Sequence, residues 1–184
     1  MLADGSFTNI DQNQATVHIK APQDTEIVRL NGELNKTYIA FGARGQQGAA
    51  NQVEQDKNAA KLSSEVLVQR AMTKQSAYYS NASWDLCDAW SQKKVKIEDL
   101  KEEQLPENMK KMTVEQRKKY VTDMVAKRKS IQDKIKKLNS EREKYVSAER
   151  RKLAEKEGKQ SLDEAIVNTV REQAGKKAFK FEKK

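Results

Sequence analysis

A run of 44 residues without proline or glycine, residues 114–157, is the feature that most constrains how this chain folds. Thr113 and Gln116 have the spacing of a helix capping box at its start, and Gly158 is the next residue that favours a helix end. A continuous helix of this length is about 66 Å long at 1.5 Å per residue. That exceeds the diameter of a small domain, so we expect the helix to extend beyond one compact core.

Apolar residues recur along this predicted helix at three- and four-residue spacing and form a seam. Arg117, Arg128 and Arg142 stand at seam positions and interrupt it. We expect a last helix, from Leu162 to Gly175, to fold back on the long one as a hairpin, and we expect the seam to bind a partner protein or a second copy of the chain. The candidate partner-binding residues are Val121, Met124, Ile131, Ile135, Leu138 and Tyr145.

The net charge of +9 belongs mainly to the C-terminal half of the chain. Residues 113–157 contain 15 Lys and Arg against 8 Asp and Glu, and residues 158–184 contain 7 against 4. Such a surface attracts nucleic acids and other polyanions in a salt-dependent way, although a solvated helix face explains the same pattern. The candidate polyanion-binding residues, which spread around the helix, are Lys134, Lys136, Lys137, Arg150, Arg151 and Lys152.

Composition leaves few catalytic arrangements to consider. The chain has one histidine, His18, and one cysteine, Cys87, which are too few for a Cys/His zinc cluster, and we also expect no Cys–His dyad. His18 has no acidic residue at a useful spacing, and no other acid–base pair stands out. We therefore expect a protein that is not an enzyme and that holds no cofactor in this chain.

The sequence contains no apolar run near the roughly 20 residues that cross a bilayer, and no basic-then-apolar leader follows Met1. We expect no membrane span, and the compartment stays open.

The first 45 residues predict a few α/β elements. Short strands fit between Gly5 and Ile19, a helix runs from Asp24 to near Asn35, and residues 37–41 favour a strand. Two or three such elements cannot close a sheet, because each isolated strand leaves backbone groups unpaired. We expect an incomplete piece of a larger α/β domain, or a sheet that a partner completes. The residues that we interpret as a hinge after it are Gly42, Gly45 and Gly48.

Residues 46–112 favour helices followed by a linker. The segment from Gln46 to Trp90 predicts two helices or one broken helix, with Ser80 or Asn81 as the cap of a short helix that carries Trp84. The aromatic residues of this part either fill the core or stack on bases or a partner. They are Tyr78, Tyr79, Trp84 and Trp90.

Three motifs in the first half of the chain occur together. They are Leu2-Ala3-Asp4-Gly5-Ser6-Phe7; Ala21-Pro22 with Asp24, Leu30-Asn31, Leu34-Asn35 and Thr37-Tyr38-Ile39; and Tyr79-Ser80-Asn81-Ala82-Ser83-Trp84-Asp85-Leu86. In combination they resemble the end of a von Willebrand factor type A domain and its C-terminal helical extension, as found in bacterial proteins of that family.

The resemblance implies that residues 5–11 form the last strand of the sheet, that residues 24–34 form the final helix packed on it, and that the residues after Gly42 form the extension. The family's magnesium-binding Asp-x-Ser-x-Ser loop lies in the first part of the domain, which has no counterpart here, so a metal site would lie upstream. The resemblance also implies a C-terminal piece of a longer protein, a role in ligand or protein binding, and relatives that look exported.

We therefore expect a mainly α fold with a small, incomplete α/β piece at the N-terminus. The expected divisions are an α/β end at 1–45, a helical extension and linker at 46–112, and a long charged helix with a C-terminal helix and basic tail at 113–184. The expected function is a non-enzymatic protein–protein interaction or assembly module, with non-specific nucleic-acid or polyanion binding as the alternative.

Overall fold

The computed structural model describes residues 18–76, 78–157, 162–177 and 179, and within these residues the chain is mainly helical and contains no β-strand. Two short 3-10 turns, η1 (Ile97–Asp99) and η2 (Glu102–Gln104), lie between α4 and α5. The helices are α1 (Asp24–Asn35), α2 (Gly45–Leu62), α3 (Ser64–Gln75), α4 (Leu86–Ser91), α5 (Glu107–Lys110), α6 (Val114–Glu157) and α7 (Leu162–Lys176).

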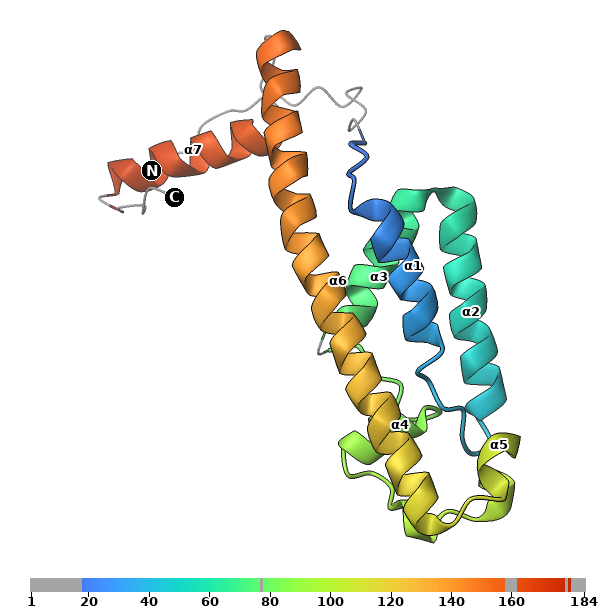
Figure 1. Cartoon of the computed structure of the whole chain (residues 1–184). Helices are drawn as coiled ribbons and strands as arrows, with labels where there is room; N and C mark the ends of the chain where they lie inside the picture. Colours follow the sequence, from blue (N-terminus) through green and yellow to red (C-terminus); the bar gives the residue numbers. More distant parts are fainter. Residues whose placement is uncertain (1–17, 77, 158–161, 178, 180–184) are drawn as a thin grey trace. The chain divides into compact units, whose positions relative to one another are not determined.

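The chain divides into two compact units, and the unit from Lys20 to Lys144 holds α1 to α5 and most of α6. In this unit α2 and α3 form an antiparallel hairpin, α1 packs on α3, and α6 runs alongside them (Figure 1). Ser63 forms the turn of the hairpin, because its hydroxyl accepts a hydrogen bond from the backbone N–H of Val66 and caps α3.

One hydrophobic core lies where α1, α3 and α6 meet. Each helix contributes residues at three- or four-residue spacing, so each presents one apolar stripe to the others. The buried members are Ile27, Leu30, Leu34, Val68, Ala71, Ile131 and Ile135.

A second core lies around α4, where the predicted linker of residues 92–111 packs against the start of α6. Apolar residues of this linker are buried there: Ile97 is fully buried and Leu105 is 5% exposed. The buried members are Ile39, Leu86, Cys87, Ile97, Leu105, Met109 and Val121.

The apolar seam of α6 belongs to these two cores. Val121 and Met124 pack in the second core, and Ile131, Ile135 and Leu138 pack in the first. The structure therefore places five of the six candidate partner-binding residues inside the chain's own packing. α1, α3 and residues 95–109 together supply the apolar surface that covers this seam.

The expectation of a strand at residues 37–41 is wrong. Ala40 and Asp85 form one isolated antiparallel bridge, supported by bonds from the N–H of Phe41 to the carbonyl of Trp84 (2.9 Å) and from Leu86 to Ile39 (2.8 Å). The bridge cannot extend, because α4 begins at Leu86 on one side and Gly42 turns the chain on the other with a positive φ of 65°. Of the strands expected between Gly5 and Ile19, the part up to residue 17 lies outside the described residues, and His18 and Ile19 are not in a strand.

The three glycines interpreted as a hinge have other roles. Gly42 makes the turn, whereas Gly45 and Gly48 lie within α2 and allow its backbone to pack closely on Ala40 and Trp84. The expected cap of the short helix also differs: Asp85, not Ser80 or Asn81, caps α4 by accepting a hydrogen bond from the N–H of Asp88.

The expected divisions at residues 45/46 and 112/113 fall inside the unit from Lys20 to Lys144. The reason is that α1 and α6, on either side of the expected middle domain, share a core with α3. The other unit contains the part of α6 from Tyr145 onward and α7, and the fold-back of α7 on α6 stays a prediction. In the described part of the chain, no helix combines the length and apolarity that a membrane span needs.

Candidate functional site

Residues 45–53 and 75–84 are the two longest stretches of the chain without Asp, Glu, Lys or Arg, although 34% of all residues are charged. The first forms the N-terminal half of α2, and the second leads from the end of α3 towards α4. In the folded unit these stretches meet at one pocket.

The pocket has a volume of about 490 Å³, which is within the range of ligand-binding pockets. Five of the described residues that line it carry carboxamides, one carries a phenol, and Arg44 is the one with a formal charge. The complete lining is Arg44, Gln47, Gly48, Asn51, Gln52, Gln55, Tyr79, Asn81 and Trp84.

Gly48 brings the backbone of α2 directly against the indole of Trp84 at this pocket. A Cβ at Gly48 would lie 2.3 Å from Cγ of Trp84, which is too close for any side chain. The indole of Trp84 also packs against the ring of Tyr38, with the ring centroids 5.6 Å apart. Trp84 is only 8% exposed. Trp84 therefore fixes the two stretches to each other and is not a free stacking platform.

Gln52 forms the polar inner wall of the pocket. It is 5% exposed, and its Oε1 accepts hydrogen bonds from the hydroxyl of Tyr79 (2.9 Å) and from Nδ2 of Asn81 (3.3 Å). Its Nε2 donates to Oδ1 of Asn35 (3.2 Å). The wall is consequently held from both sides before any ligand arrives.

Behind this wall lies a buried charge cluster centred on Asp56. Its Oδ2 accepts hydrogen bonds from Nζ of Lys74 (2.7 Å), from Nδ2 of Asn31 (2.9 Å) and from Nδ2 of Asn35 (2.7 Å), and its Oδ1 accepts one from Nε of Arg70 (2.6 Å). Asn35 belongs to this cluster and to the pocket wall, so the two are continuous.

Burial and pairing act in opposite directions on the charges of this cluster. Burial alone would raise the pKa of Asp56, but the hydrogen bonds from Lys74 and Asn35 outweigh it and lower that pKa. Burial lowers the pKa of Lys74, and the hydrogen bond to Asp56 counters this only in part. Both groups thus hold each other charged inside the fold.

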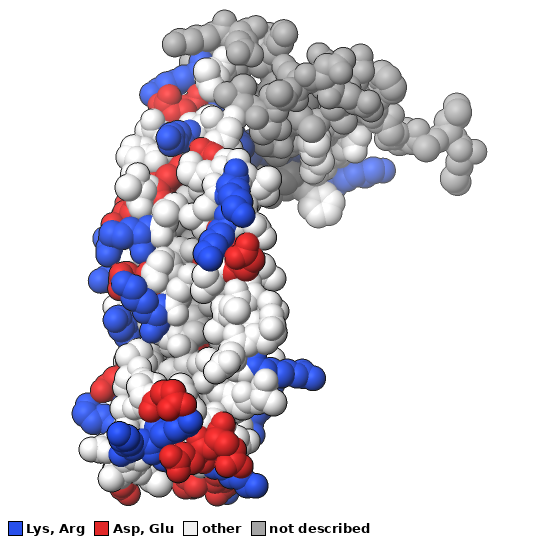
Figure 2. All heavy atoms as spheres, turned by 90° about the vertical axis from the view of Figure 1, so that its right-hand side faces the viewer, with Lys and Arg blue, Asp and Glu red and all other residues white. Residues whose placement is uncertain are grey.

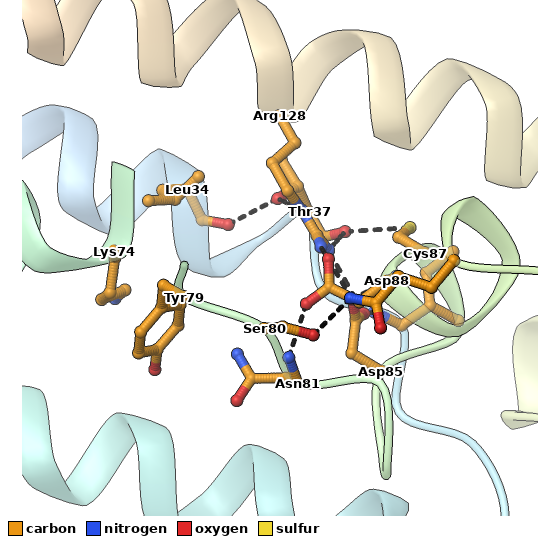
Figure 3. Close-up of polar contacts among 12 residues, drawn as sticks. Leu34, Thr37, Lys74, Tyr79, Ser80, Asn81, Asp85, Cys87, Asp88 and Arg128 are labelled. Atoms are coloured by element: carbon orange, nitrogen blue, oxygen red, sulfur yellow. Dashed lines mark hydrogen bonds and ion pairs between the residues drawn. The ribbon is translucent and has the colours of Figure 1, made fainter. Parts of the chain in front are cut away.

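A second buried cluster joins α6 to Thr37 and to the start of α4, which directly follows the pocket residue Trp84 (Figure 3). Arg128 reaches from α6 and donates from Nη1 to Asp85 (2.7 Å) and Asp88 (2.6 Å), from Nη2 to the carbonyl of Thr37 (2.8 Å) and Asp85 (3.2 Å), and from Nε to Oγ1 of Thr37 (3.1 Å). Its guanidinium also lies 4.1 Å from the ring centroid of Tyr38, a cation–π contact.

Burial disfavours the charged form of Arg128, yet the hydrogen bonds and the charge of Asp85 raise its pKa above the ordinary value. Burial raises the pKa of Asp88. The hydrogen bond from the backbone N–H of Asn81 and the charge of Arg128 lower this pKa, but they offset the effect of burial only in part. Burial likewise raises the pKa of the Cys87 thiol to about 12, so this cysteine is a packing residue held as the neutral thiol at physiological pH.

The carboxylates of Asp85 and Asp88 also hold backbone near the pocket. Asp88 accepts a hydrogen bond from the backbone N–H of Asn81 (2.7 Å), and Asp85 accepts one from the N–H of Ile39 (2.7 Å).

The groups that face the pocket can donate and accept hydrogen bonds, and Arg44 can pair with an anion. In the described part of the chain, no group of three or more His, Cys, Asp or Glu is placed to hold a metal ion.

The uncharged face of the unit is visible in Figure 2, which views the side on which α2 lies in Figure 1. Uncharged side chains occupy much of the middle of this face, whereas Lys, Arg, Asp and Glu lie below it, to its left and in its upper part. The two uncharged stretches contain several exposed residues, including Gln46, Gln47, Asn51 and Val53 of α2 and Tyr78, which is 97% exposed.

The structure places the other candidate residues elsewhere. Tyr145, the sixth candidate for partner binding, is 37% exposed. The six candidate polyanion-binding residues are all exposed, and one of them, Lys152, pairs with Glu149 (2.6 Å). The aromatic residues divide: Trp84 and Trp90 pack in the interior, and Tyr78 projects into solvent.

The pocket was not predicted from the sequence, although a signal for it exists. The two uncharged stretches could have been found by a count of charge along the chain, but that they meet depends on the tertiary fold. Comparisons of the chain with protein-family models, with curated proteins and with solved structures found no match.

Proposed function

We propose that this chain is a non-enzymatic protein-binding module whose partner docks on the uncharged face of α2 and in its pocket. The observation that supports this most is that the two longest uncharged stretches of a highly charged chain meet at one pocket. Interface cores in proteins are depleted of charged residues, because a charge is costly to remove from water.

Folding alone does not require these residues to be uncharged. Gln46, Gln47 and Asn51 are exposed, so a lysine or glutamate at each position would remain in water in the free protein. The exposed face of α6 carries many such charges. The absence of charge in the N-terminal half of α2 therefore fits a surface that loses its water when something binds.

The hydrogen bonds behind the pocket also favour binding. Gln52 and Asn81 are fixed by partners within the chain, and the ion pair of Asp56 with Lys74 joins α2, which carries Gln52, to α3. A wall that is already ordered pays little conformational entropy on association.

A peptide library displayed on phage and panned against the full chain tests this function. The proposal predicts enriched peptides that bind the wild type and lose binding to Asn51→Lys and Gln55→Lys, two exposed pocket positions. Asn58→Lys, an exposed position of α2 outside the pocket lining, is the matched control and should bind as the wild type does. Enriched peptides that ignore both pocket substitutions would contradict the proposal.

The relation to von Willebrand factor type A proteins remains a proposal that rests on the three motifs alone. Their residues between 24 and 39 and between 79 and 86 lie in the unit from Lys20 to Lys144, and α1 packs there on helices. The genomic sequence upstream of this chain tests the relation: an in-frame Asp-x-Ser-x-Ser motif would support it, and its absence would argue against it.

Polyanion binding is the second candidate function, favoured by the exposure of Lys134, Lys136 and Lys137 on α6. Acidic neighbours weaken it, since Lys129 and Lys119 already pair with Asp133 and Asp123. Titration of labelled DNA and RNA at two salt concentrations tests this candidate: affinity should fall steeply with salt, and an absence of binding at low salt would exclude it.

A further inference from the structure

We infer that the pocket binds an extended peptide along α2, with a carboxylate of that peptide paired with Arg44; this rests on the proposed docking function and names its ligand. Three observations support this inference. They are a row of carboxamide side chains on α2, the cation of Arg44 at the start of that row, and the hydrogen-bonded wall around Gln52 beside it.

Gln47, Asn51 and Gln55 are each four residues apart on α2, so they lie in one row along the same face of the helix. Nε2 of Gln47 donates to Oδ1 of Asn51 (2.7 Å), which aligns the first two carboxamides of the row. Four residues of helix span about 6 Å. An extended peptide advances about 6.6 Å for every two residues.

This near match lets one carboxamide face the main chain at every second residue of an extended peptide. Each carboxamide has a donor and an acceptor, as does each peptide group, so pairs of hydrogen bonds can form along the row. Side chains of a different shape would not repeat this pairing. The row from residue 44 to residue 55 is about 16 Å long, enough for about five extended residues.

Arg44 stands at the start of the row and is exposed. Among the nine described residues that line the pocket it alone carries a charge, and the first turn of α2 contains no acidic residue. A guanidinium binds a carboxylate through two parallel hydrogen bonds. The matching group on the peptide is a C-terminal carboxylate or the side chain of Asp or Glu.

The other side of the peptide would contact the fixed wall. The hydroxyl of Tyr79 donates to Gln52 and keeps an acceptor lone pair for a ligand, and Asn81 is held by Gln52 and by the carboxylate of Asp88. These groups are in place without a ligand, which favours recognition of a main chain in one register.

Three fluorescein-labelled peptides of six residues, composed of glycine, serine and threonine, test the inference with the full-length chain. The first has a free C-terminal carboxylate, the second is the same peptide with an amidated C-terminus, and the third is amidated and ends in glutamate. Binding is measured by fluorescence anisotropy, and contacts by the side-chain amide signals of asparagine and glutamine in ¹H–¹⁵N NMR spectra.

We expect the first or the third peptide, or both, to bind at least tenfold more tightly than the second, and to shift the side-chain amide signals of Asn51 and Gln55. Which of the two binds identifies the source of the carboxylate. Arg44→Gln should remove this difference, whereas Lys61→Gln, the same change of charge at an exposed position of α2 outside the pocket, should leave it unchanged.

Equal affinity for all three peptides, or signals that shift only outside the pocket, would overturn the inference. If the library yields pocket-dependent peptides that need neither a carboxylate nor Arg44, the inference fails and the docking function stands. If no library peptide depends on the pocket and none of the three peptides binds, both fail.

Discussion

Arg128 and Arg142 are core residues of α6 because each finds acidic partners inside the fold. Arg128 directs hydrogen bonds from all three of its nitrogens to Thr37, Asp85 and Asp88, and Nε of Arg142 donates to Asp24 (2.6 Å). Both side chains are less than a tenth exposed. The arginines therefore continue the seam of α6 between and beyond its apolar residues.

Arg128→Met tests this role. We expect the free energy of unfolding to fall by about 3–5 kcal/mol, because the substitution leaves the carboxylate of Asp85 buried without its cation. Lys129→Met, the neighbouring position on the exposed face, should change it by less than about 0.5 kcal/mol, since its pair with Asp133 lies at the surface. Urea unfolding measures both, and equal effects would contradict the assignment.

Asp56 should make the stability of the fold depend on acid pH. Its pKa in the folded chain lies below the ordinary value of 3.8, so its stabilising contribution is complete above that pH and is lost as the pH falls through the folded pKa. Asp56→Asn should be less stable than the wild type at pH 7, because Lys74 and Arg70 lose their anion.

The same variant should lose less stability than the wild type between pH 5 and pH 2.5. Urea unfolding across this range measures the difference in stability between the two proteins. The contributions of other titrating groups, such as Asp88, are the same in both and cancel in this difference. Parallel stability curves for the two proteins would show that Asp56 is not ionised against Lys74.

At the scale of the helices, the contact between α2 and Trp84 depends on one glycine. We expect Gly48→Ala to lower the free energy of unfolding by about 1–3 kcal/mol, because the new methyl group would overlap the indole. Gly32→Ala in α1, where the added methyl group would meet no side chain or neighbouring element within 4 Å, should instead raise the free energy of unfolding by about 0.5–1 kcal/mol through helix propensity. Thermal unfolding of both variants tests whether the two changes in stability have opposite signs.

The helices that local signals define were predicted well from the sequence. α1 runs from Asp24 to Asn35 as expected, and the box of Thr113 and Gln116 forms, with bonds of 2.8 and 3.3 Å, at the start of a helix that ends before Gly158. Caps and helix breakers act within a few residues, so a single sequence carries them.

The features that could not be predicted from the sequence depend on partners far along the chain. Arg128 read as an interruption of the seam because Asp85, which pairs with it, lies 43 residues away. Residues 37–41 have strand-forming side chains, but their partner is a single bridge beside α4. The pocket forms only where residues 45–53 and 75–84 meet, and no local sequence pattern predicts that they meet.

At the scale of the whole molecule, the unit from Lys20 to Lys144 should fold without the remainder of the chain. A fragment of residues 20–144 should unfold cooperatively, because it contains both cores and the Arg128 and Arg142 ion pairs. A fragment of residues 46–112 should not, since it lacks the apolar stripes of α1 and α6. Circular dichroism during heating distinguishes them, and a cooperative transition in the shorter fragment would contradict this division.

The two cores and the two ion clusters fix the helices that carry the uncharged face, and this rigidity is what suits the face to docking. The most direct measurement is hydrogen–deuterium exchange by mass spectrometry of the full chain, with and without a library peptide that binds it. We expect protection at residues 44–55 and 79–84 and unchanged exchange along the exposed face of α6. Protection confined to α6 or α7 would show that the partner docks elsewhere and would contradict it.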